Sequence, residues 1–378
     1  MEAGPFSISD IVKLTGTHEE LVRVSLDKLQ AIGLLGSSNS KSSPGYILLP
    51  DSGYVFGVDL GGTKIMAAIA DLSGRIVAEL TEATDSRGDF HVLNQIRQIA
   101  ARLLARVSLG ALDIRAIAVG IPGAVDPVTG VTSLLPNIEG FGELHIGDGL
   151  AERFDCTVVV ENDVNMAVLG EAWRGSAIGR KHVSFLSLGT GVGLGNIVAG
   201  KLLRGISGAA GEIAFMPIGR DLTSSDARKY GSFELEVGTQ GIVARCRSLG
   251  ATSVNSAKDV FDLLENGDRA AIQTIEETAR YIALAITSVQ FLFDPELVVL
   301  GGSIGTRMEL VSRIANILPE LAAKPVQIVA SGLGSRAGLF GAISLAIGQA
   351  LSEQLDEPQA NPNETAARIS VATAMQRI

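Results

Sequence analysis

Apolar positions in the first fifty residues follow the spacing of two short helices. The stretch SDIVKLTG predicts a helix that Ser9 caps and the final glycine ends. In THEELVRVSLDKLQAIG the side chains of Val22, Leu26 and Leu29 fall on one helical face. The following LLGSSNSKSSPGYILLP predicts two short strands around a serine-rich loop. This order predicts a winged helix-turn-helix module over residues 1–50, short for its class because only MEAGP precedes FSISD.

From Tyr54 onward, stretches with the period of strands alternate with stretches that have the period of helices. Residues 54–80 predict a β-hairpin, and IRAIAVGIPG predicts a buried strand that ends in a loop of glycine and proline. Between them we expect an amphipathic helix with an apolar face made by Leu93, Ile96, Ala100 and Leu103. Such alternation predicts an α/β lobe.

The same plan recurs in the second half of the chain. HVSFLSLGTGVGLGNIVAGKLLRG is again strand, glycine turn and strand, ELVVLGGSIG is a strand that ends in a glycine loop, and GSRAGLFGAISLAIGQAL is a helix. The recurrence predicts two lobes, residues 54–165 and 166–334, with the first completed by a helix over residues 335–350. The polar tail over residues 352–378 is expected to be disordered.

The first hairpin carries an acid, two glycines and a lysine at its tip. Asp59 ends one strand, Gly61 and Gly62 form the turn, and Lys64 follows. Glycine lets the backbone approach a ligand, and successive amides in a tight turn form an anion-binding concavity. A Gly-Gly turn is equally an ordinary hairpin connection. This hairpin alone leaves both interpretations open.

The second hairpin with a glycine tip favours the phosphate cradle. One nucleotide clamped between two lobes would account for both tips together. Asp59 then has a function as well, because a carboxylate beside a polyphosphate usually holds Mg²⁺, often through water. We therefore expect Mg²⁺ to accompany the nucleotide.

Composition and charge argue against several other classes of protein. The net charge of −10 and the pI near 5 disfavour general attraction of the whole surface to nucleic acid or membrane. The longest apolar stretch, YIALAITSVQFLF, is too short to span a bilayer. Only Cys156 and Cys246 are present, far apart, and no charged-then-apolar leader opens the sequence. We expect a cytoplasmic protein with no membrane partner.

An ordered set of motifs resembles the ROK family, whose members are repressors and sugar kinases. The motifs are DLGGTK, GIPGAV, LPNIEGFGE, VENDVNMAVLGE, LSLGTGVGLG, GAAGEIAF and VVLGGS, and they cover roughly residues 54–348. The resemblance implies an actin-like, hexokinase-like α/β fold with a sugar cleft between the lobes and ATP beside it. The N-terminal module resembles the winged helix-turn-helix of the repressor branch.

The resemblance also implies roles for individual residues. Asp163 matches the catalytic base, which takes the proton of the sugar hydroxyl that attacks the γ-phosphate. The residues implied for phosphate and ATP binding are Asp59, Gly61, Gly62, Thr63, Lys64, Gly189, Thr190, Gly191, Gly193, Gly301 and Gly302. The residues expected to line the sugar site are Gly123, Asn137, Asn162, Asp163, Glu212 and Glu234.

The sequence departs from the family at the segment that usually binds zinc. The family continues its glutamate motif as GExGH, whose histidine binds both sugar and zinc, whereas GEIAF places Phe215 there. The cysteine cluster that should follow is replaced by GRDLTSSDARKYGSFELE, without Cys or His. We expect no zinc site, packing of Phe215 with Phe233 in its place, and weakened catalysis or an altered ligand.

Three hypotheses remain open at this point. The N-terminal module favours a sugar-responsive transcription regulator that binds operator DNA through residues 7–50, as a homodimer on paired half-sites. The intact glycine turns and Asp163 favour an ATP-dependent hexose or N-acetylhexosamine kinase, and a scaffold with neither activity is the third. The acidic start of the second helix, THEE, weakens the case for DNA. We rank the regulator first, because a helix-turn-helix with a wing is otherwise hard to explain in front of this body.

Overall fold

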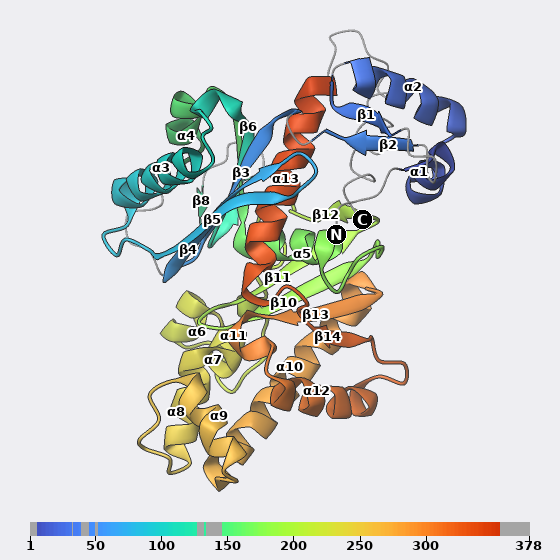
Figure 1. Cartoon of the computed structure of the whole chain (residues 1–378). Helices are drawn as coiled ribbons and strands as arrows, with labels where there is room; N and C mark the ends of the chain where they lie inside the picture. The colour runs from blue at the N-terminus through green and yellow to red at the C-terminus, as the bar shows by residue number, and fades with distance from the viewer. Residues whose placement is uncertain are drawn as a thin grey trace. The chain divides into compact units, whose positions relative to one another are not determined.

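The chain divides into two compact units, and each unit is described here by itself. The computed structural model describes residues 6–31, 33–38, 45–49, 52–126, 132–133 and 146–355 (Figure 1). Unit 1 comprises Met1–Ile121, Leu144–Glu161 and Ala342–Ile378, and unit 2 comprises Pro122–Glu143 and Asn162–Gly341. The division differs from the expected lobes mainly because residues 122–143 belong to unit 2.

The N-terminal module has the elements that the apolar pattern predicts. They are α1 (Ile8–Thr15), α2 (Glu19–Ala31), β1 (Leu35–Ser38) and β2 (Gly45–Leu48), with β1 and β2 antiparallel (Figure 1). Val22, Leu26 and Leu29 are fully buried, which confirms the predicted apolar face of α2. Gly16 follows α1 in the left-handed conformation, at φ 64°, where the absence of a Cβ removes the steric cost. Two helices joined by a turn and a pair of antiparallel strands are therefore present, in the predicted order.

The entry into α1 differs from the expectation. Ser7, and not Ser9, caps the helix, since the Ser7 hydroxyl accepts a hydrogen bond of 3.2 Å from the amide of Asp10. The Asp10 carboxylate accepts a bond of 3.0 Å from the Ser7 amide in return. Phe6 then bridges Tyr46 of β2 through two backbone hydrogen bonds of 2.9 Å. The segment before α1 thus joins the sheet of the wing.

The rest of unit 1 is built around a five-stranded sheet with strand order β5-β4-β3-β6-β9. Its elements are β3 (Tyr54–Leu60), β4 (Lys64–Asp71), β5 (Ile76–Ala83), α3 (Asp89–Arg106), η2 (Ala111–Asp113), β6 (Ile114–Ile121), α4 (Ile146–Phe154) and β9 (Thr157–Asn162). The hairpin of β3 and β4 and the buried strand β6 confirm the predictions for this half of the chain. The expected apolar face of α3 is buried as well, at Leu93, Ile96, Ala100 and Leu103.

The last helix, α13 (Ala337–Leu355), packs closely against β3 in unit 1. A Cβ atom at Gly57 would lie 2.8 Å from Cγ1 of Ile343, so the strand needs a glycine at this crossing. The helix extends beyond the expected residue 350 and includes the first residues of the predicted tail. Residues 356–378 of that tail lie outside the described residues.

Unit 2 contains a second five-stranded sheet, with strand order β12-β11-β10-β13-β14. Its strands and short helical turns are β7 (Ala124–Val125), β8 (Thr132–Ser133), β10 (Val183–Leu188), β11 (Val192–Val198), β12 (Lys201–Leu202), η4 (Ile213–Phe215), β13 (Leu297–Gly301), β14 (Ile328–Ala330) and η5 (Gly334–Arg336). Its helices are α5 (Asp163–Arg174), α6 (Ser225–Tyr230), α7 (Ser232–Val237), α8 (Thr239–Ser248), α9 (Ala257–Glu265), α10 (Arg269–Phe293), α11 (Gly302–Gly305) and α12 (Met308–Leu321). The predicted second hairpin is present as the antiparallel pair β10 and β11.

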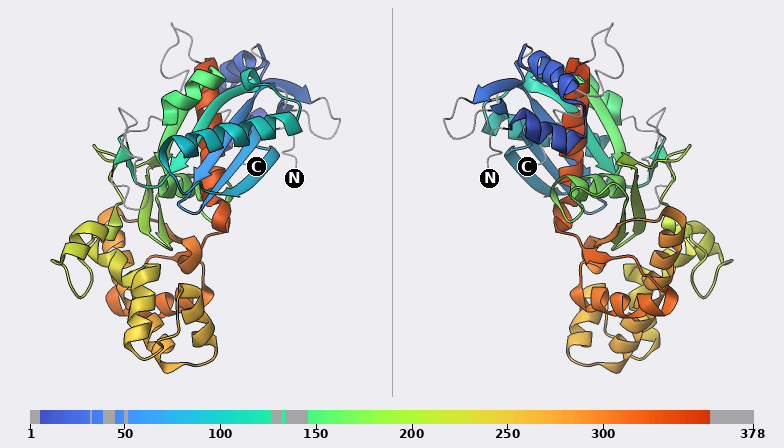
Figure 2. Two further views of the ribbon diagram at one scale, coloured as in Figure 1. Left: turned by 90° about the vertical axis from the view of Figure 1, so that its left-hand side faces the viewer. Right: turned by 90° about the vertical axis from the view of Figure 1, so that its right-hand side faces the viewer.

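Helices cover both faces of this sheet, with α5 on one face and α10 on the other (Figure 2). Alternate residues of β10 explain the arrangement, because Phe185 packs with α5 whereas Leu186 and Leu188 join the core formed with α10.

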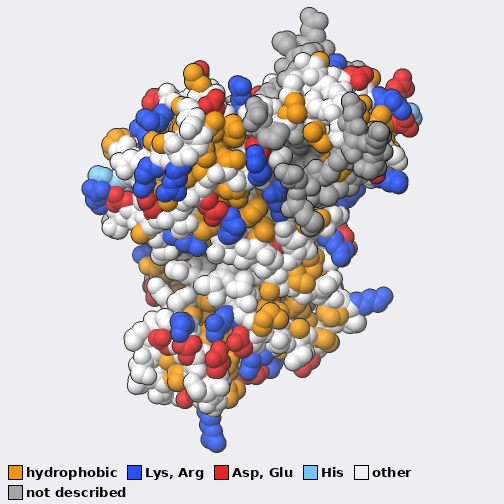
Figure 3. Space-filling model, in the orientation of Figure 1, with side chains coloured by type: hydrophobic (Ala, Val, Ile, Leu, Met, Phe, Trp, Pro, Cys, Tyr) orange, Lys and Arg blue, Asp and Glu red, His pale blue; other side chains and the backbone are white. Residues whose placement is uncertain are grey.

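The apolar stretch over residues 281–293 is the second half of α10, although Phe291 and Leu292 at its end are mostly exposed. Among the described residues, no helix combines the length and the apolar character needed to cross a membrane. Acidic and basic side chains are interspersed over the face shown in Figure 3.

Candidate functional site

The first glycine turn lies in unit 1, between the ends of β3 and β4. Gly61 donates its amide to the carbonyl of Lys64 at 2.9 Å, and a Cβ at Gly62 would meet no atom within 4 Å. Thr84, just after β5, stabilises the turn through two hydrogen bonds. Its hydroxyl donates to the Gly61 carbonyl at 2.7 Å, and its amide donates to the Thr63 carbonyl at 3.1 Å. The tip is therefore an exposed, anchored loop with open space beside a glycine.

Asp59 lies near the end of β3, two residues before Gly61. Burial raises the pKa of Asp59 from 3.8 to about 6, and the neighbouring charge of Lys64 opposes that rise only in part. The carboxylate is still mostly ionised at neutral pH, where it can bind a cation or water. Burial therefore destabilises the ionised form of Asp59. Groups with a pKa perturbed in this way are common at ligand-binding sites.

In unit 2, Asn162 and Asp163 stand at the start of α5. The Asn162 side chain caps the helix by accepting bonds of 2.9 Å from the amides of Val164 and Asn165. Its nitrogen donates to the carbonyl of Gly123 at 2.9 Å. Asp163, half-buried, accepts a bond of 2.8 Å from the Val164 amide through one carboxylate oxygen. Asn162 thus fixes the start of α5, and with it the position of Asp163.

Glu234 links α7 to the second glycine turn. Its Oε2 accepts a hydrogen bond of 2.9 Å from the Val192 amide, and a Cβ at Gly191 would lie 3.3 Å from the same oxygen. Burial raises the pKa of Glu234, although the bond from Val192 opposes this. Burial, and secondly the charge of Glu234, raises the pKa of Glu212. Glu234 therefore lies beside the turn, Glu212 lies close enough for its pKa to respond to the charge of Glu234, and both carboxylates can accept bonds from hydroxyl groups.

The ends of the parallel strands β10 and β13 bring the other two glycine segments together. Gly302 has φ +76° and a Cβ there would overlap the carbonyl of Leu188, so only glycine fits. A Cβ at Gly189 would lie 3.5 Å from the hydroxyl of Ser303. The Gly189 carbonyl accepts bonds of 3.0 and 3.1 Å from the amide and hydroxyl of Thr239. The loops after neighbouring parallel strands are a common place for nucleotide binding in α/β sheets.

Two threonines that fix these turns escaped the sequence analysis. Thr84 and Thr239 lie 23 and 50 residues from the glycines whose carbonyls they bind. A threonine after a strand or at a helix start has no sequence signal that identifies its distant acceptor. By contrast, the expected site residue Asn137 lies outside the described residues.

The expected aromatic replacement for the zinc site is wrong. Phe233 is fully buried in the core of unit 2, whereas the side chain of Phe215, at the end of η4, is 43% exposed. Across the part of the chain that the structure describes, no group of three or more His, Cys, Asp or Glu side chains could hold a metal ion. The segment after Glu212 instead carries an ionic contact between Arg220 and Glu236, and Glu236 also pairs with Arg245.

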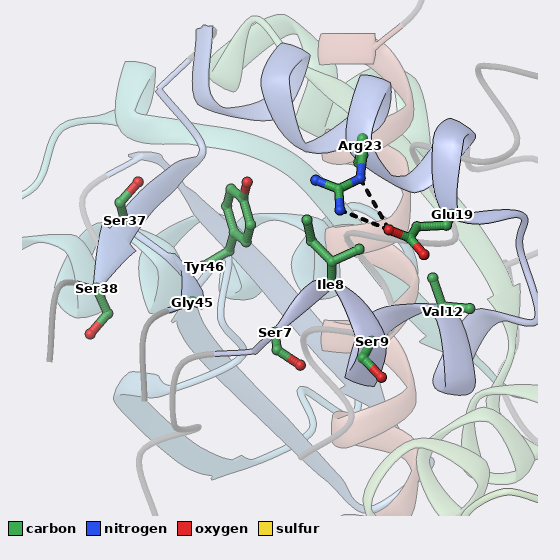
Figure 4. A pocket seen from close by; sticks show the side chains of 10 residues that line it. All are labelled: Ser7, Ile8, Ser9, Val12, Glu19, Arg23, Ser37, Ser38, Gly45 and Tyr46. Atoms are coloured by element: carbon green, nitrogen blue, oxygen red, sulfur yellow. Dashed lines mark hydrogen bonds and ion pairs between the residues drawn. The ribbon is translucent and has the colours of Figure 1, made fainter. Parts of the chain in front are cut away.

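The N-terminal module carries a hollow of about 570 Å³ between its helices and its wing (Figure 4). It is lined by Ser7, Ile8, Ser9, Val12, Glu19, Arg23, Ser37, Ser38, Gly45 and Tyr46. Arg23 of α2 donates to one oxygen of Glu19 from Nη2 at 2.7 Å and from Nε at 3.1 Å. The positive charge of Arg23 is thereby partly neutralised within its own helix.

Comparison with known proteins identifies relatives of both kinds. The model of the ROK family matches residues 55–349. The chain is 28% identical to a glucokinase of Thermotoga maritima over 77% of this chain and 96% of the relative. It is 23% identical to a xylose repressor of Bacillus spizizenii, with 92% of both chains covered.

Solved structures give the same two groups. A ROK family transcriptional regulator, a homologue of the E. coli MLC protein, has a TM-score of 0.77 at 20% identity and covers 99% of this chain and 94% of its own. A ROK family glucokinase from Streptomyces griseus, solved with glucose and AMPPNP, has a TM-score of 0.64 at 29% identity and covers 78% and 99%. These similarities confirm the α/β fold expected from the motifs, that of the actin-like ROK proteins.

Proposed function

Because the chain belongs to the ROK family, we propose that it is a sugar-responsive transcription regulator. In this proposal the N-terminal module binds operator DNA, and the body binds a sugar whose presence changes the affinity for DNA. The protein acts as a homodimer, since paired half-sites require two modules.

The observation that carries the proposal is a pair of helices followed by two antiparallel strands, which we interpret as a helix-turn-helix with its wing. The helices α1 and α2 meet at the left-handed Gly16, and the antiparallel strands β1 and β2 follow. The extent of similarity supports it as well, because the xylose repressor aligns over 92% of this chain and the glucokinase of T. maritima over 77%. A kinase has no use for the additional module.

The sugar is proposed to bind beside Glu212 and Glu234, with Asp163, Asn162 and Gly123 from the neighbouring segments. Two partly buried carboxylates discriminate between sugars well, because a missing hydroxyl would leave a buried acceptor unpaired. Asn137 belongs to the same proposal on the resemblance alone.

ATP with Mg²⁺ is proposed as a second ligand. The proposed contacts are Asp59, Gly61, Gly62, Thr63 and Lys64 of the first turn, Gly189, Thr190, Gly191 and Gly193 of the second, and Gly301 and Gly302. The space beside Gly62 and the left-handed Gly302 fit a backbone that approaches phosphate groups. The AMPPNP complex of the S. griseus relative supports this choice of nucleotide. Bound Mg²⁺ would neutralise phosphate charge beside Asp59.

Footprinting on the DNA upstream of the protein's own gene tests the proposal. We expect protection of two half-sites, and a change in affinity when one sugar from a panel of hexoses, pentoses and N-acetylhexosamines is added. The same panel in a thermal-shift assay identifies the sugar, since only a ligand that binds the native state raises its Tm. Absence of any DNA binding over a range of salt concentrations would refute the regulator.

An ATP-dependent hexose or N-acetylhexosamine kinase is the second candidate, favoured by Asp163. Its half-buried carboxylate at the start of α5 can accept the proton of a sugar hydroxyl as that oxygen attacks phosphorus. Exposure of Phe215, where the family has a sugar-binding histidine, predicts slow or absent turnover. Robust phosphorylation by the unmodified protein, abolished in Asp163→Asn, would make the kinase the primary function.

A further inference from the structure

The segment after Glu212 is held by a cluster of ionic groups where the family resemblance implies zinc. Residues 213–236 contain neither Cys nor His. They do contain Arg220 and Glu236, and the Glu236 carboxylate pairs with both Arg220 and Arg245, the latter from α8. A guanidinium group cannot ligate a metal ion, and both oxygens of the Glu236 carboxylate already accept bonds from the arginines, so these residues do not fit zinc.

Glu236 is the centre of this cluster. Its Oε1 accepts bonds from the Arg220 amide at 2.9 Å and from the Arg220 Nε at 3.4 Å. Its Oε2 accepts a short bond from Arg245, whose Nη2 also donates to the Glu236 carbonyl at 3.0 Å. Burial alone would raise the pKa of Glu236, but the bonds from Arg220 and the charge of Arg245 outweigh it and lower the pKa. The ionised carboxylate is therefore stabilised where it lies.

Helix α10 anchors the buried arginine from the other side. Arg245 is only 3% exposed, and its Nη1 donates to the hydroxyl of Thr278 at 2.8 Å. Glu277 lies 3.6 Å from the Arg245 Nε and 3.8 Å from the Arg220 Nε. The Tyr281 ring centroid lies 5.4 Å from the Arg245 guanidinium carbon. The cluster thus joins four parts of unit 2: the loop at Arg220, α7, α8 and the core helix α10.

Further contacts bind the same loop to α7. The Ser232 hydroxyl donates to the Met216 carbonyl at 2.9 Å. A Cβ at Gly219 would lie 3.1 Å from Cγ of Glu236, and a Cβ at Gly231 would overlap the carbonyl of Ala214. The loop therefore lies flat against the helix.

The same short helix carries a site residue. Glu234 lies two positions before Glu236 in α7 and binds the Val192 amide of the second glycine turn. Glu212, whose pKa responds to the charge of Glu234, directly precedes η4. Any shift of α7 relative to its neighbours would change the distance between these two carboxylates.

We propose that the cluster of Arg220, Glu236 and Arg245 replaces a structural metal and positions Glu234 and Glu212 for ligand binding. Glu236 and Arg245 are positioning residues in this proposal, since they act on the ligand through α7. The claim that the cluster positions Glu234 and Glu212 for a sugar rests on the proposed function. The claim that residues 213–238 fold without a metal does not depend on it.

Three variants and one control test the proposal. Glu236→Gln and Arg245→Met each remove the central ion pair. Arg220→Gln removes only the exposed cation, and it keeps the test possible if a buried substitution prevents folding. Glu276→Gln is the matched control, because it removes a carboxylate of α10 whose exposed pair, 3.2 Å long, is with Arg313 of α12 and lies outside the cluster. Hydrogen exchange followed by mass spectrometry reports on residues 213–238 and on the Val192 amide.

We expect faster exchange in both segments for all three variants and no change for Glu276→Gln. The affinity for the sugar that raises the Tm of the unmodified protein should fall by about 10-fold in Glu236→Gln, the effect of a lost bond to a charged group. Affinity for AMPPNP with Mg²⁺ should change much less. Because no metal is involved, excess EDTA should leave the Tm and the exchange of residues 213–238 unaltered.

Several results would overturn the proposal. One zinc per chain by elemental analysis, with a fall of Tm in EDTA, would restore the metal. Unchanged hydrogen exchange over residues 213–238 in Glu236→Gln would show that the cluster does not stabilise this segment. Faster exchange with unchanged sugar affinity would remove its positioning role. If no sugar in the panel raises the Tm of the unmodified protein, the proposed sugar response fails, and the exchange measurements still decide the structural claim.

Discussion

Replacement of Asp59 by asparagine should stabilise the protein in a pH-dependent manner. The carboxyl group ionises with a pKa of about 6 in the fold, against an ordinary value of 3.8, because partial burial near the end of β3 removes water from it. At 1.36 kcal/mol for each pKa unit, the difference of about 2.2 units corresponds to about 3 kcal/mol. That free energy is the cost of holding the ionised carboxylate in the folded state.

The sign of the effect follows from the two pKa values. Below pH 3.8 the group is protonated in the folded and unfolded chain, so the pKa difference then costs no stability. As the pH rises toward 6 the unfolded chain loses its proton first and the folded protein becomes less stable, after which the cost is constant. The stabilisation by Asp59→Asn should therefore grow between these values and reach a plateau at neutral pH.

Scanning calorimetry from pH 4 to 8, in EDTA to exclude divalent cations, measures this difference. Asp85→Asn is a control of opposite sign, because hydrogen bonds from Arg87 lower the pKa of Asp85 and the substitution removes a favourable charge. A gain in Tm that is independent of pH, or a loss of stability in Asp59→Asn at pH 8, would refute the assignment of a buried, strained carboxylate. The same variant should lose Mg²⁺-dependent AMPPNP binding if Asp59 serves the nucleotide.

The remaining predictions concern the module, the ligand site and one backbone position. Arg23→Gln should lower the slope of log affinity for operator DNA against log salt by about 0.9, the effect of one lost phosphate contact, and Glu19→Gln should raise the affinity, both by fluorescence anisotropy. An unchanged slope in Arg23→Gln would exclude this arginine as a phosphate contact. Phe215→His should raise the rate of sugar phosphorylation measured in a coupled assay, and no increase would mean that the missing histidine does not limit turnover. Gly302→Ala should cost more than about 1 kcal/mol of stability in thermal unfolding, since φ is +76° and the methyl group overlaps a carbonyl, whereas Gly348→Ala, with no atom within 4 Å, should be neutral or stabilising.

The sequence predicted the fold well because periodic patterns determine the elements. The apolar face of α3 and the two glycine hairpins depend on residues close together in the chain, and both are present. Local capping was less predictable, since Ser7 and Ser9 have the same chemistry and stand two positions apart. The choice of Ser7 follows from Asp10, which completes a capping box only with the earlier serine.

The candidate site was predictable only in part, for a physical reason that the zinc segment makes clear. Motifs predicted Glu212 and Glu234 as sugar-site residues, and the segment after Glu212 lacks the Cys and His that would ligate zinc. What replaces a metal cannot be deduced from residue types, because Phe215 is an obvious packing residue and is nevertheless 43% exposed. Glu236 and Arg245, nine residues apart, look like ordinary charges of surface helices, and their burial appears only when α8 and α10 enclose them. The buried charge of Arg245 is tolerated because it pairs with the Glu236 carboxylate and its terminal nitrogens donate hydrogen bonds. The residues that stabilise the candidate site therefore depend on tertiary packing for their role, and the sequence alone does not predict that role.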